Sequence, residues 1–212
     1  MSVICPTVTA LDAHEYREQL ERIEPFAERI HLDFMDGDFA PTVSVSLEQA
    51  WLPENKQVDI HIMYKNPEKY LDTLIRLRPH MVIVHAESNC DIPAFAARLR
   101  ENSIKTGVAI LQGTNVEDVA YLFPHVQHVL IFSGDLGHFG GHADMALTEK
   151  ATQAKQAHKY LEIGWDGGIN EENVAELAEK GIDVLNIGGA IQKSENPQST
   201  YATMKSKIDS HA

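Results

Sequence analysis

The sequence has few cysteines and no long apolar run. Cys5 and Cys90 are the two cysteines among 212 residues, too few for a disulfide framework and without the paired spacing of a zinc–thiolate site. We therefore expect both to be core or surface thiols, and neither to be a nucleophile. No stretch approaches the ~20 apolar residues that a membrane helix needs, so we expect no membrane span.

Positive charge is also scarce. The 18 lysines and arginines are outnumbered by 31 acidic residues, which gives a formal net charge of -13 and opposes general binding of nucleic acid. The first residues contain no basic leader of a secretory signal, so we expect a cytoplasmic protein. We expect the protein to bind a small molecule and to form a homo-oligomer. Because the protein is acidic overall, an anionic ligand would need hydrogen-bond donors within its binding site.

What the sequence does contain is an alternation of short apolar runs and helical segments. Strands are predicted at 2–8, 29–34, 58–63, 81–86, 105–111, 128–132, 161–166 and 183–189. Helical periodicity is present at 14–23, 67–77, 93–101, 115–122, 144–160 and 171–180, and more weakly near 46–51. Eight units of ~26 residues predict an α/β fold, a (β/α)₈ TIM barrel that forms a single domain over residues 1–212. A doubly wound open sheet is the alternative, because alternation alone does not show closure.

Residues with ionisable side chains collect where these strands are predicted to end. In "HLDFMDG" (31–37), His31 and Asp33 are two positions apart, so they point to the same face of a strand. The same kind of residue recurs at three other strands, as Asp59 with His61, His85 with Glu87, and Asp166 in "WDGG". Because a barrel carries its active site at the carboxyl ends of its strands, these residues are candidates for one site. Two imidazoles and two carboxylates suit a divalent ion such as Zn²⁺, Fe²⁺, Mn²⁺ or Co²⁺.

Other histidines and acids receive different interpretations. Asp59 lies one residue pair below His61 and either orients that ring or forms a salt bridge. Asp36 and Asp38 are expected to shape the turn after the second strand. The histidines predicted to have a surface role are His14, His80, His125, His128, His138, His142, His158 and His211.

Paired glycines form a second group of candidates. The pairs are Gly140 with Gly141, Gly167 with Gly168, and Gly188 with Gly189, after the sixth, seventh and eighth predicted strands. Glycine lets backbone N–H groups approach an anion closely, and the loops after strands seven and eight frequently bind phosphate in such barrels. A short helix starting at "GGAIQ" would direct its positive end at that group. A phosphate could thus be bound without added lysines.

Several stretches resemble the ribulose-phosphate 3-epimerase family, from "CPTVTALD" (5–12) to "IGGAI" (187–191). The most specific matches are "HLDFMDGDFAP" (31–41), "DIHIM" (59–63), "NPEKY" (66–70), "VHAES" (84–88), "GVAILQGT" (107–114) and "WDGGINEENV" (165–174). The resemblance implies a ribulose-phosphate-binding barrel and a metal-dependent 3-epimerase of a ketose phosphate. The default substrate pair is D-ribulose 5-phosphate and D-xylulose 5-phosphate.

The resemblance also implies roles for individual residues. One divalent metal ion would be bound by His31, Asp33, His61 and Asp166, and the two aspartates would also be the acid–base pair. The substrate would contact Thr7, which stands where the family usually has a serine, and also His61, Met35, Met63, Gly188 and Gly189. Two bases on opposite sides suit this reaction, because the proton removed beside the carbonyl must be returned to the other face of a planar enediolate.

One loop departs from the family pattern. The stretch "SGDLGHFGGHAD" (133–144) is longer than the family's Pro-Gly-Phe-Gly-Gly-Gln loop, Gln112 replaces a usual proline, and Gly189 replaces a common serine. These changes surround the distal end of the substrate, so a six-carbon ketose phosphate such as allulose 6-phosphate is a close alternative. A metal-dependent aldolase or lyase and a non-catalytic sugar-phosphate-binding protein are further alternatives. Neither needs two opposed bases.

Overall fold

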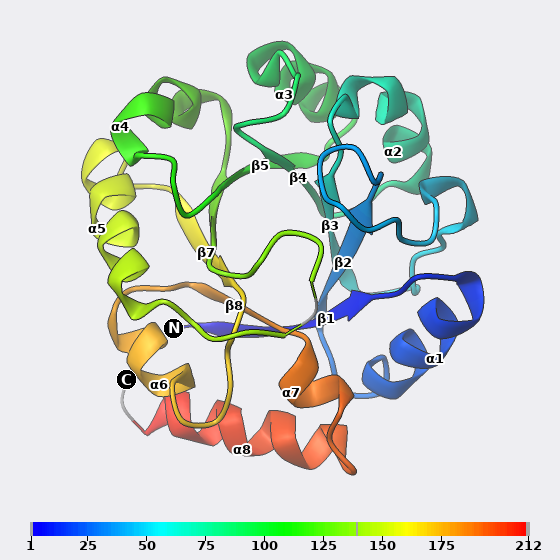
Figure 1. Cartoon of the computed structure of the whole chain (residues 1–212), viewed down its shortest axis with the longest axis vertical. Helices are drawn as coiled ribbons and strands as arrows, with labels where there is room; N and C mark the ends of the chain where they lie inside the picture. The colour runs from blue at the N-terminus through cyan, green and yellow to red at the C-terminus, as the bar shows by residue number, and fades with distance from the viewer. Residues whose placement is uncertain (1, 139, 211–212) are drawn as a thin grey trace.

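The structure is a computed structural model that describes residues 2–138 and 140–210. Its eight parallel strands are β1 (Val3–Thr9), β2 (Arg29–Met35), β3 (Gln57–Met63), β4 (Met81–His85), β5 (Lys105–Ile110), β6 (His128–Phe132), β7 (Glu162–Asp166) and β8 (Val184–Ile187). Each strand pairs with the next, and β8 pairs with β1, which closes the barrel (Figure 1). The predicted TIM barrel is confirmed, and the open-sheet alternative is wrong.

Helices surround the barrel, as Figure 1 shows. They are α1 (Ala13–Ile23), α2 (Leu71–Leu77), α3 (Ile92–Glu101), α4 (Val116–Val119), α5 (Thr148–Ala157), α6 (Val174–Glu179), α7 (Gly189–Gln192) and α8 (Pro197–Asp209). Short 3₁₀ helices occupy Leu47–Gln49, Pro67–Tyr70, Ala120–His125 and Met145–Leu147. Among the described helices, none is both long and apolar enough to cross a membrane.

Two helix predictions need correction. The segment near 46–51 contains only the 3₁₀ helix Leu47–Gln49. The helix predicted at 115–122 is a four-residue α helix followed by a 3₁₀ helix that contains Pro124, and proline cannot donate the backbone hydrogen bond that continues an α helix. The sequence analysis did not identify α8, which begins with Asn196 as its cap and Pro197 in its first turn.

The local sequence explains how the strands and helices pack. All seven residues of β2 are buried, because alternate side chains face the helices and the barrel interior. Ile30 and Leu32 belong to the core between barrel and helices. Helix α1 starts where the Asp12 side chain accepts hydrogen bonds from two backbone N–H groups, and it buries Tyr16 and Leu20.

The barrel interior is layered. Its middle is a small apolar cluster of Met81, Ile83, Ala109 and Leu130. Below that layer, at the amino ends of the strands, lies a charged group that we call the Arg29 cluster, which consists of Arg29, Asp59, His80, His128 and Glu162. Above it, at the carboxyl ends, lie the candidate site residues described in the next subsection.

The Arg29 cluster corrects two histidine predictions. His128 is 1% exposed and its Nδ1 lies 2.8 Å from Glu162 Oε2. The Nδ1 of His80, whose side chain is 20% exposed, lies 2.8 Å from Asp59 Oδ1. Their expected surface role was wrong, because a strand start in a closed barrel can point inward. The expectation for His211 lies outside the described residues.

Candidate metal centre and active site

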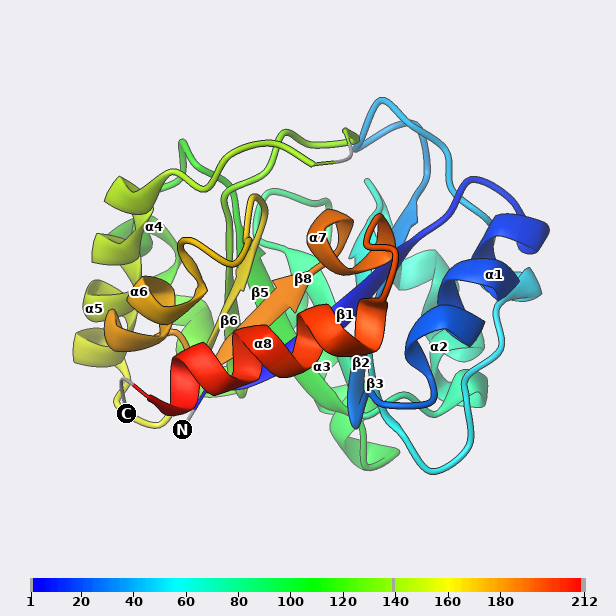
Figure 2. The ribbon, with the colours of Figure 1, turned by 90° about the horizontal axis from the view of Figure 1, so that it is seen from below.

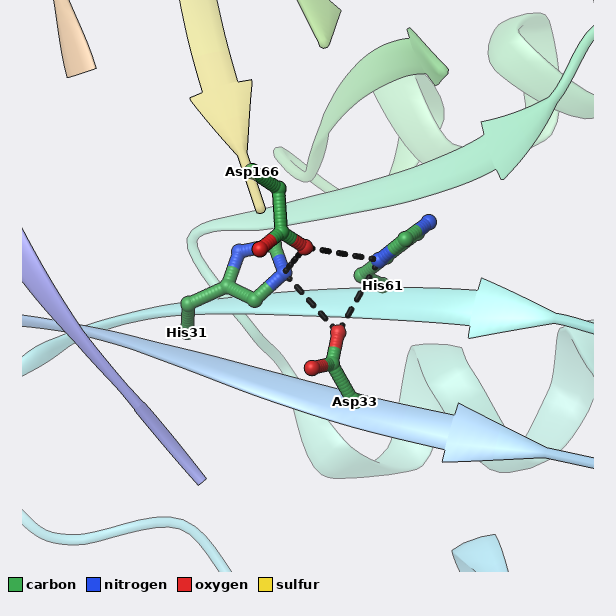
Figure 3. A group of neighbouring side chains, drawn as sticks. All are labelled: His31, Asp33, His61 and Asp166. Atoms are coloured by element: carbon green, nitrogen blue, oxygen red, sulfur yellow. Dashed lines mark hydrogen bonds and ion pairs between the residues drawn. The ribbon is translucent and has the colours of Figure 1, made fainter. Parts of the chain in front are cut away.

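Four side chains from three strands meet at the carboxyl end of the barrel (Figure 3). Asp33 Oδ1 lies 3.1 Å from His31 Nε2 and 3.0 Å from His61 Nδ1. Asp166 Oδ2 lies 3.7 Å from the same nitrogen of His31 and 3.9 Å from that of His61. Both imidazoles are fully buried, while the aspartate side chains are 8% and 13% exposed. We call this group the mouth cluster.

The mouth cluster fits a divalent metal ion. One ligand atom from each side chain can be chosen so that all four lie within 4.8 Å of one another. Ligand atoms around a tetrahedral zinc at about 2.0–2.1 Å stand about 3.3 Å apart, close to the separations observed here. The cluster also buries two carboxylates that have imidazoles as neighbours, and a cation would balance their charge. Nitrogen and carboxylate ligands are compatible with Zn, Fe, Mn or Co.

The two aspartates differ electrostatically. Burial raises the pKa of Asp166 above its ordinary value, and the nearby charge of Asp33 raises it further. Burial alone would also raise the pKa of Asp33, but His31 and His61 outweigh burial and hold that pKa below its ordinary value. Burial lowers the pKa of His61 to about 4, which favours the neutral imidazole that a metal ligand must be.

His85 lies behind the cluster and contacts one of its imidazoles. Its Nε2 is 2.9 Å from His61 Nε2, and its Nδ1 is 3.5 Å from Glu87 Oε2. If a metal ion occupies Nδ1 of His61, the proton of this neutral ring is on Nε2, which then donates to His85 Nε2. Glu87 is anchored in turn by Leu111 N at 3.0 Å and by the Thr114 hydroxyl. His85 therefore orients the ring of His61.

Asp59 does not orient that ring. Its carboxylate accepts from Arg29 Nε at 2.6 Å and lies 2.8 Å from His80 Nδ1. Of the two readings left open for Asp59, the salt bridge is the one that the structure contains.

A cavity of about 810 Å³ opens beside the mouth cluster. Asp33 and Asp166 line it, as do Thr7, Met35 and Met63. Both methionines are 3% exposed and pack with Ala40. The three glycine pairs also line the cavity: Gly140, Gly141, Gly167, Gly168, Gly188 and Gly189. Of the predicted site residues, His61 and the metal ligand His31 are the two that do not line the cavity wall, and both rings are fully buried.

Two of these glycines are required by a close approach of the backbone. A Cβ on Gly167 would lie 2.2 Å from Gly134 N, and one on Gly168 would lie 2.0 Å from Ala143 N. Both glycines also have positive φ, +113° and +72°. The loop 133–144 therefore passes directly against the turn after β7. At Gly188, in contrast, a Cβ would make only an ordinary contact, 3.6 Å from Thr7 Cβ.

The described parts of this loop, residues 133–138 and 140–144, also cross the barrel mouth, as Figures 1 and 2 show. Gly137 O accepts a hydrogen bond from Thr42 Oγ1, and Leu136 packs against the cluster of Met35 and Met63. Gln112, which replaces the usual proline, donates to Ser133 O at 2.9 Å. Two of the departures from the family pattern, Gln112 and the segment that begins at Ser133, thus contact each other.

Sequence reasoning missed several residues of the site. Thr9 Oγ1 donates to Asp33 Oδ2 at 2.8 Å, and Thr9 follows Thr7 by two positions on the same strand face. That spacing was a usable signal. Phe132, Asn186 and His138 also line the cavity, and His138 is exposed, as predicted, while doing so.

Comparison with known proteins gives a consistent assignment. The sequence pattern of the ribulose-phosphate 3 epimerase family matches residues 3–192. The ribulose-phosphate 3-epimerase of Aquifex aeolicus is 28% identical over 218 residues, with 97% of this chain and 96% of the relative covered. That of Mycobacterium tuberculosis (strain ATCC 25618 / H37Rv) is 25% identical over 213 residues, with 96% and 91% covered.

Among solved structures, a 3-hexulose-6-phosphate synthase superposes with a TM-score of 0.77 at 14% identity, covering 97% of this chain and 99% of that one. At that identity the likeness shows the fold alone.

Proposed function

Because the chain belongs to the ribulose-phosphate 3-epimerase family, we propose that it interconverts D-ribulose 5-phosphate and D-xylulose 5-phosphate with a bound divalent ion and two aspartates as bases. Its relatives are isomerases that act on carbohydrate phosphates, and this chain is one as well. We propose a single-domain, homo-oligomeric cytoplasmic enzyme. The observation that carries the mechanism is the meeting of Asp33 and Asp166, from β2 and β7, beside one cavity.

The mouth cluster would hold the ion through His31, Asp33, His61 and Asp166. When bound, such an ion polarises a carbonyl oxygen and stabilises the negative charge that develops on it. Both imidazoles are fully buried and the aspartates are only 8% and 13% exposed, and electrostatic interactions are stronger in such surroundings than in bulk water.

Asp33 and Asp166 would transfer the proton at C3. Epimerisation removes the C3 proton from one face of the sugar and returns a proton to the other face, so a base is needed on each side. The two carboxylates come from strands on opposite sides of the barrel mouth, as Figure 1 shows. Thr9 holds Asp33 through the 2.8 Å hydrogen bond to its Oδ2, which fixes the direction of that carboxylate.

The rest of the cavity would hold the substrate. Met35 and Met63 place apolar sulfur groups beside the planar intermediate, where they limit solvent without adding a competing acid. The backbone near Gly188 and Gly189, with Gly167 and Gly168, supports phosphate binding because these positions line the cavity without bulky side chains. The loop 133–144, with Gly140 and Gly141, would close over this end.

Replacement of each aspartate by asparagine tests the two-base mechanism. Asp33→Asn and Asp166→Asn keep the shape but remove the proton acceptor, so turnover should fall by at least about 10²-fold in both. Metal content is measured beside the rate, since both residues are proposed ligands. In deuterated water, a metal-loaded variant should exchange the C3 proton of only one epimer, and the two variants should act on different epimers.

One result would contradict the two-base mechanism. If Asp166→Asn retained its metal and epimerised at a near-normal rate, the two-base mechanism would fail and a single-base or aldolase mechanism would become preferable.

The substrate itself is tested with a panel of five- and six-carbon ketose phosphates, with product stereochemistry read by NMR. The family match favours the pentulose pair, whereas faster turnover of allulose 6-phosphate would assign the enzyme to the six-carbon substrate. Formation of aldehyde fragments would indicate the aldolase reaction. Binding without any turnover would indicate the non-catalytic alternative.

A further inference from the structure

Strand β8 places a polar side chain on the floor of the cavity. Asn186 is 2% exposed and lines the cavity. It is the partner of Asp166 in the β7–β8 register, so both side chains point to the inner face of the barrel. Within residues 2–138 and 140–210, neither Oδ1 nor Nδ2 of Asn186 has a hydrogen-bond partner.

The fold itself does not require an amide at this position. Val184, two residues earlier on the same face of β8, is apolar and 1% exposed. Burying an amide without hydrogen bonds costs about 1–3 kcal/mol by mutational comparison. Buried polar groups in proteins nearly always have partners. A partner for Asn186 must therefore come from a molecule in the cavity.

The position of Asn186 indicates what that molecule presents. Asn186 lies beside the proposed base Asp166 and two residues before Gly188, where the phosphate is proposed to bind. Thr7 is next to Gly188: a Cβ added to Gly188 would lie 3.6 Å from the Cβ of Thr7. The Thr7 hydroxyl is also buried without a partner in the described chain. Two unpartnered polar groups thus lie between the reacting end and the phosphate end.

We propose that Asn186, together with Thr7, forms a hydroxyl-binding subsite that recognises the C4 hydroxyl of the ketose phosphate. The inference rests on the proposed function, which places C3 between the two aspartates and the phosphate at Gly188 and Gly189. The C4 carbon then passes Asn186. An amide offers two N–H donors and one oxygen acceptor, so it can both donate to and accept from one hydroxyl. Asn186 is accordingly a specificity-determining residue.

The test compares D-ribulose 5-phosphate with its 4-deoxy and 1-deoxy analogues in the wild-type enzyme and in Asn186→Leu. Leucine has nearly the shape of asparagine but cannot form hydrogen bonds. The variant should lose roughly 10- to 100-fold in kcat/KM for the hydroxylated substrate and little for the 4-deoxy analogue. Its melting temperature should equal or exceed that of the wild type, because no hydrogen bond within the protein is lost.

Val184→Ala is the matched control. It shortens a buried side chain on the same strand face, so it should lower the melting temperature. The ratio of kcat/KM for D-ribulose 5-phosphate to kcat/KM for its 4-deoxy analogue should stay unchanged.

Three results would overturn the inference. An equal loss with hydroxylated and 4-deoxy substrates would mean that Asn186 acts only through Asp166. A loss of discrimination against the 1-deoxy analogue alone would assign the contact to C1. A lower melting temperature for Asn186→Leu would assign the amide a structural partner. If the wild type epimerised no ketose phosphate at all, the proposed function would fail, and the inference with it.

Discussion

Two clusters of histidines and carboxylates lie at opposite ends of the same barrel interior. In the Arg29 cluster, the guanidinium bonds Glu162 through two parallel contacts of 2.8 Å and Asp59 through one of 2.6 Å. In the mouth cluster, the histidine partners of Asp33 and Asp166 lie at 3.0–3.9 Å, and no arginine or lysine is paired with either aspartate among the described residues. Each cluster contains two histidines and two carboxylates, and the Arg29 cluster also contains an arginine.

The presence or absence of the arginine distinguishes a structural cluster from the candidate functional site. The Arg29 cluster carries its own cation, and the resulting charge-assisted pairs satisfy its carboxylates within the protein. The mouth cluster leaves its negative charge to be balanced by an ion and opens into the cavity. In barrels of this kind, polar groups at the carboxyl ends of the strands serve catalysis and those at the amino ends serve stability. The following predictions test this contrast.

The largest expected effect is on metal binding. Replacing His31 and His61 together by alanine should abolish stoichiometric metal binding, measured by elemental analysis, and should lower turnover by at least about 10³-fold. The variant should also lose the stabilisation by added metal that we expect for the wild type, about 2.7 kcal/mol at 100 times the Kd.

The matched control for that variant is His80→Ala, which removes a histidine of the Arg29 cluster and should keep its metal. Full metal occupancy in the double variant would show that the ligand assignment is wrong.

The second effect is on stability. Arg29→Met removes the cation from buried carboxylates and should lower the free energy of unfolding, measured with urea, by about 3 kcal/mol or more. The metal content of the folded variant should be unchanged. Lys155→Met removes a lysine from a half-exposed pair with Asp183 and should cost less than about 1 kcal/mol. If both variants lost the same free energy of unfolding, the Arg29 cluster would be no more important for stability than a surface ion pair.

The third effect is on substrate binding at the mouth. Gly188 has negative φ, and a Cβ there meets nothing closer than 3.6 Å, so Gly188→Val should fold and bind metal normally. Its side chain would enter the cavity and displace the phosphate from the backbone N–H groups, raising KM by roughly tenfold or more. Steady-state kinetics give the answer, and an unchanged KM would count against this phosphate position.

The smallest effect is on the pH dependence of stability. Burial raises the pKa of Asp59, but the hydrogen bond with His80 and the charge of Arg29 outweigh it, and the folded-state pKa is lowered. Asp59 therefore stabilises the fold above the unfolded-state pKa of about 3.9 and loses that contribution as the pH falls through the folded-state value.

Urea unfolding between pH 5 and pH 3 should accordingly show a smaller loss of stability in Asp59→Asn than in the wild type. Asp33, whose pKa is also lowered, contributes in both proteins, so the difference between them reports on Asp59. Parallel pH profiles would contradict the role assigned to Asp59 in the Arg29 cluster.

The sequence alone predicted the strands and proposed the members of the candidate site. Regular alternation of apolar runs predicted eight strands, and β6 was predicted with its observed bounds, His128–Phe132. The two-residue spacing of His31 and Asp33 placed both on one face of β2, because side chains alternate along any strand. The glycine pair after β7 was identified from its place after the seventh predicted strand, because glycine lets the backbone approach a ligand closely.

Tertiary structure decided which polar residues meet, and at which depth. The alternation that turns His31 inward also turns Arg29, Asp59 and His128 inward, and the local pattern does not show which of these side chains contact one another. That choice depends on the register between strands, such as the pairing of Asp33 with His61 and of Asp166 with Asn186. Closure then brings β2 and β7 to one mouth although 133 positions separate Asp33 from Asp166 in the chain, and a contact over that separation is fixed only when all eight strands have paired.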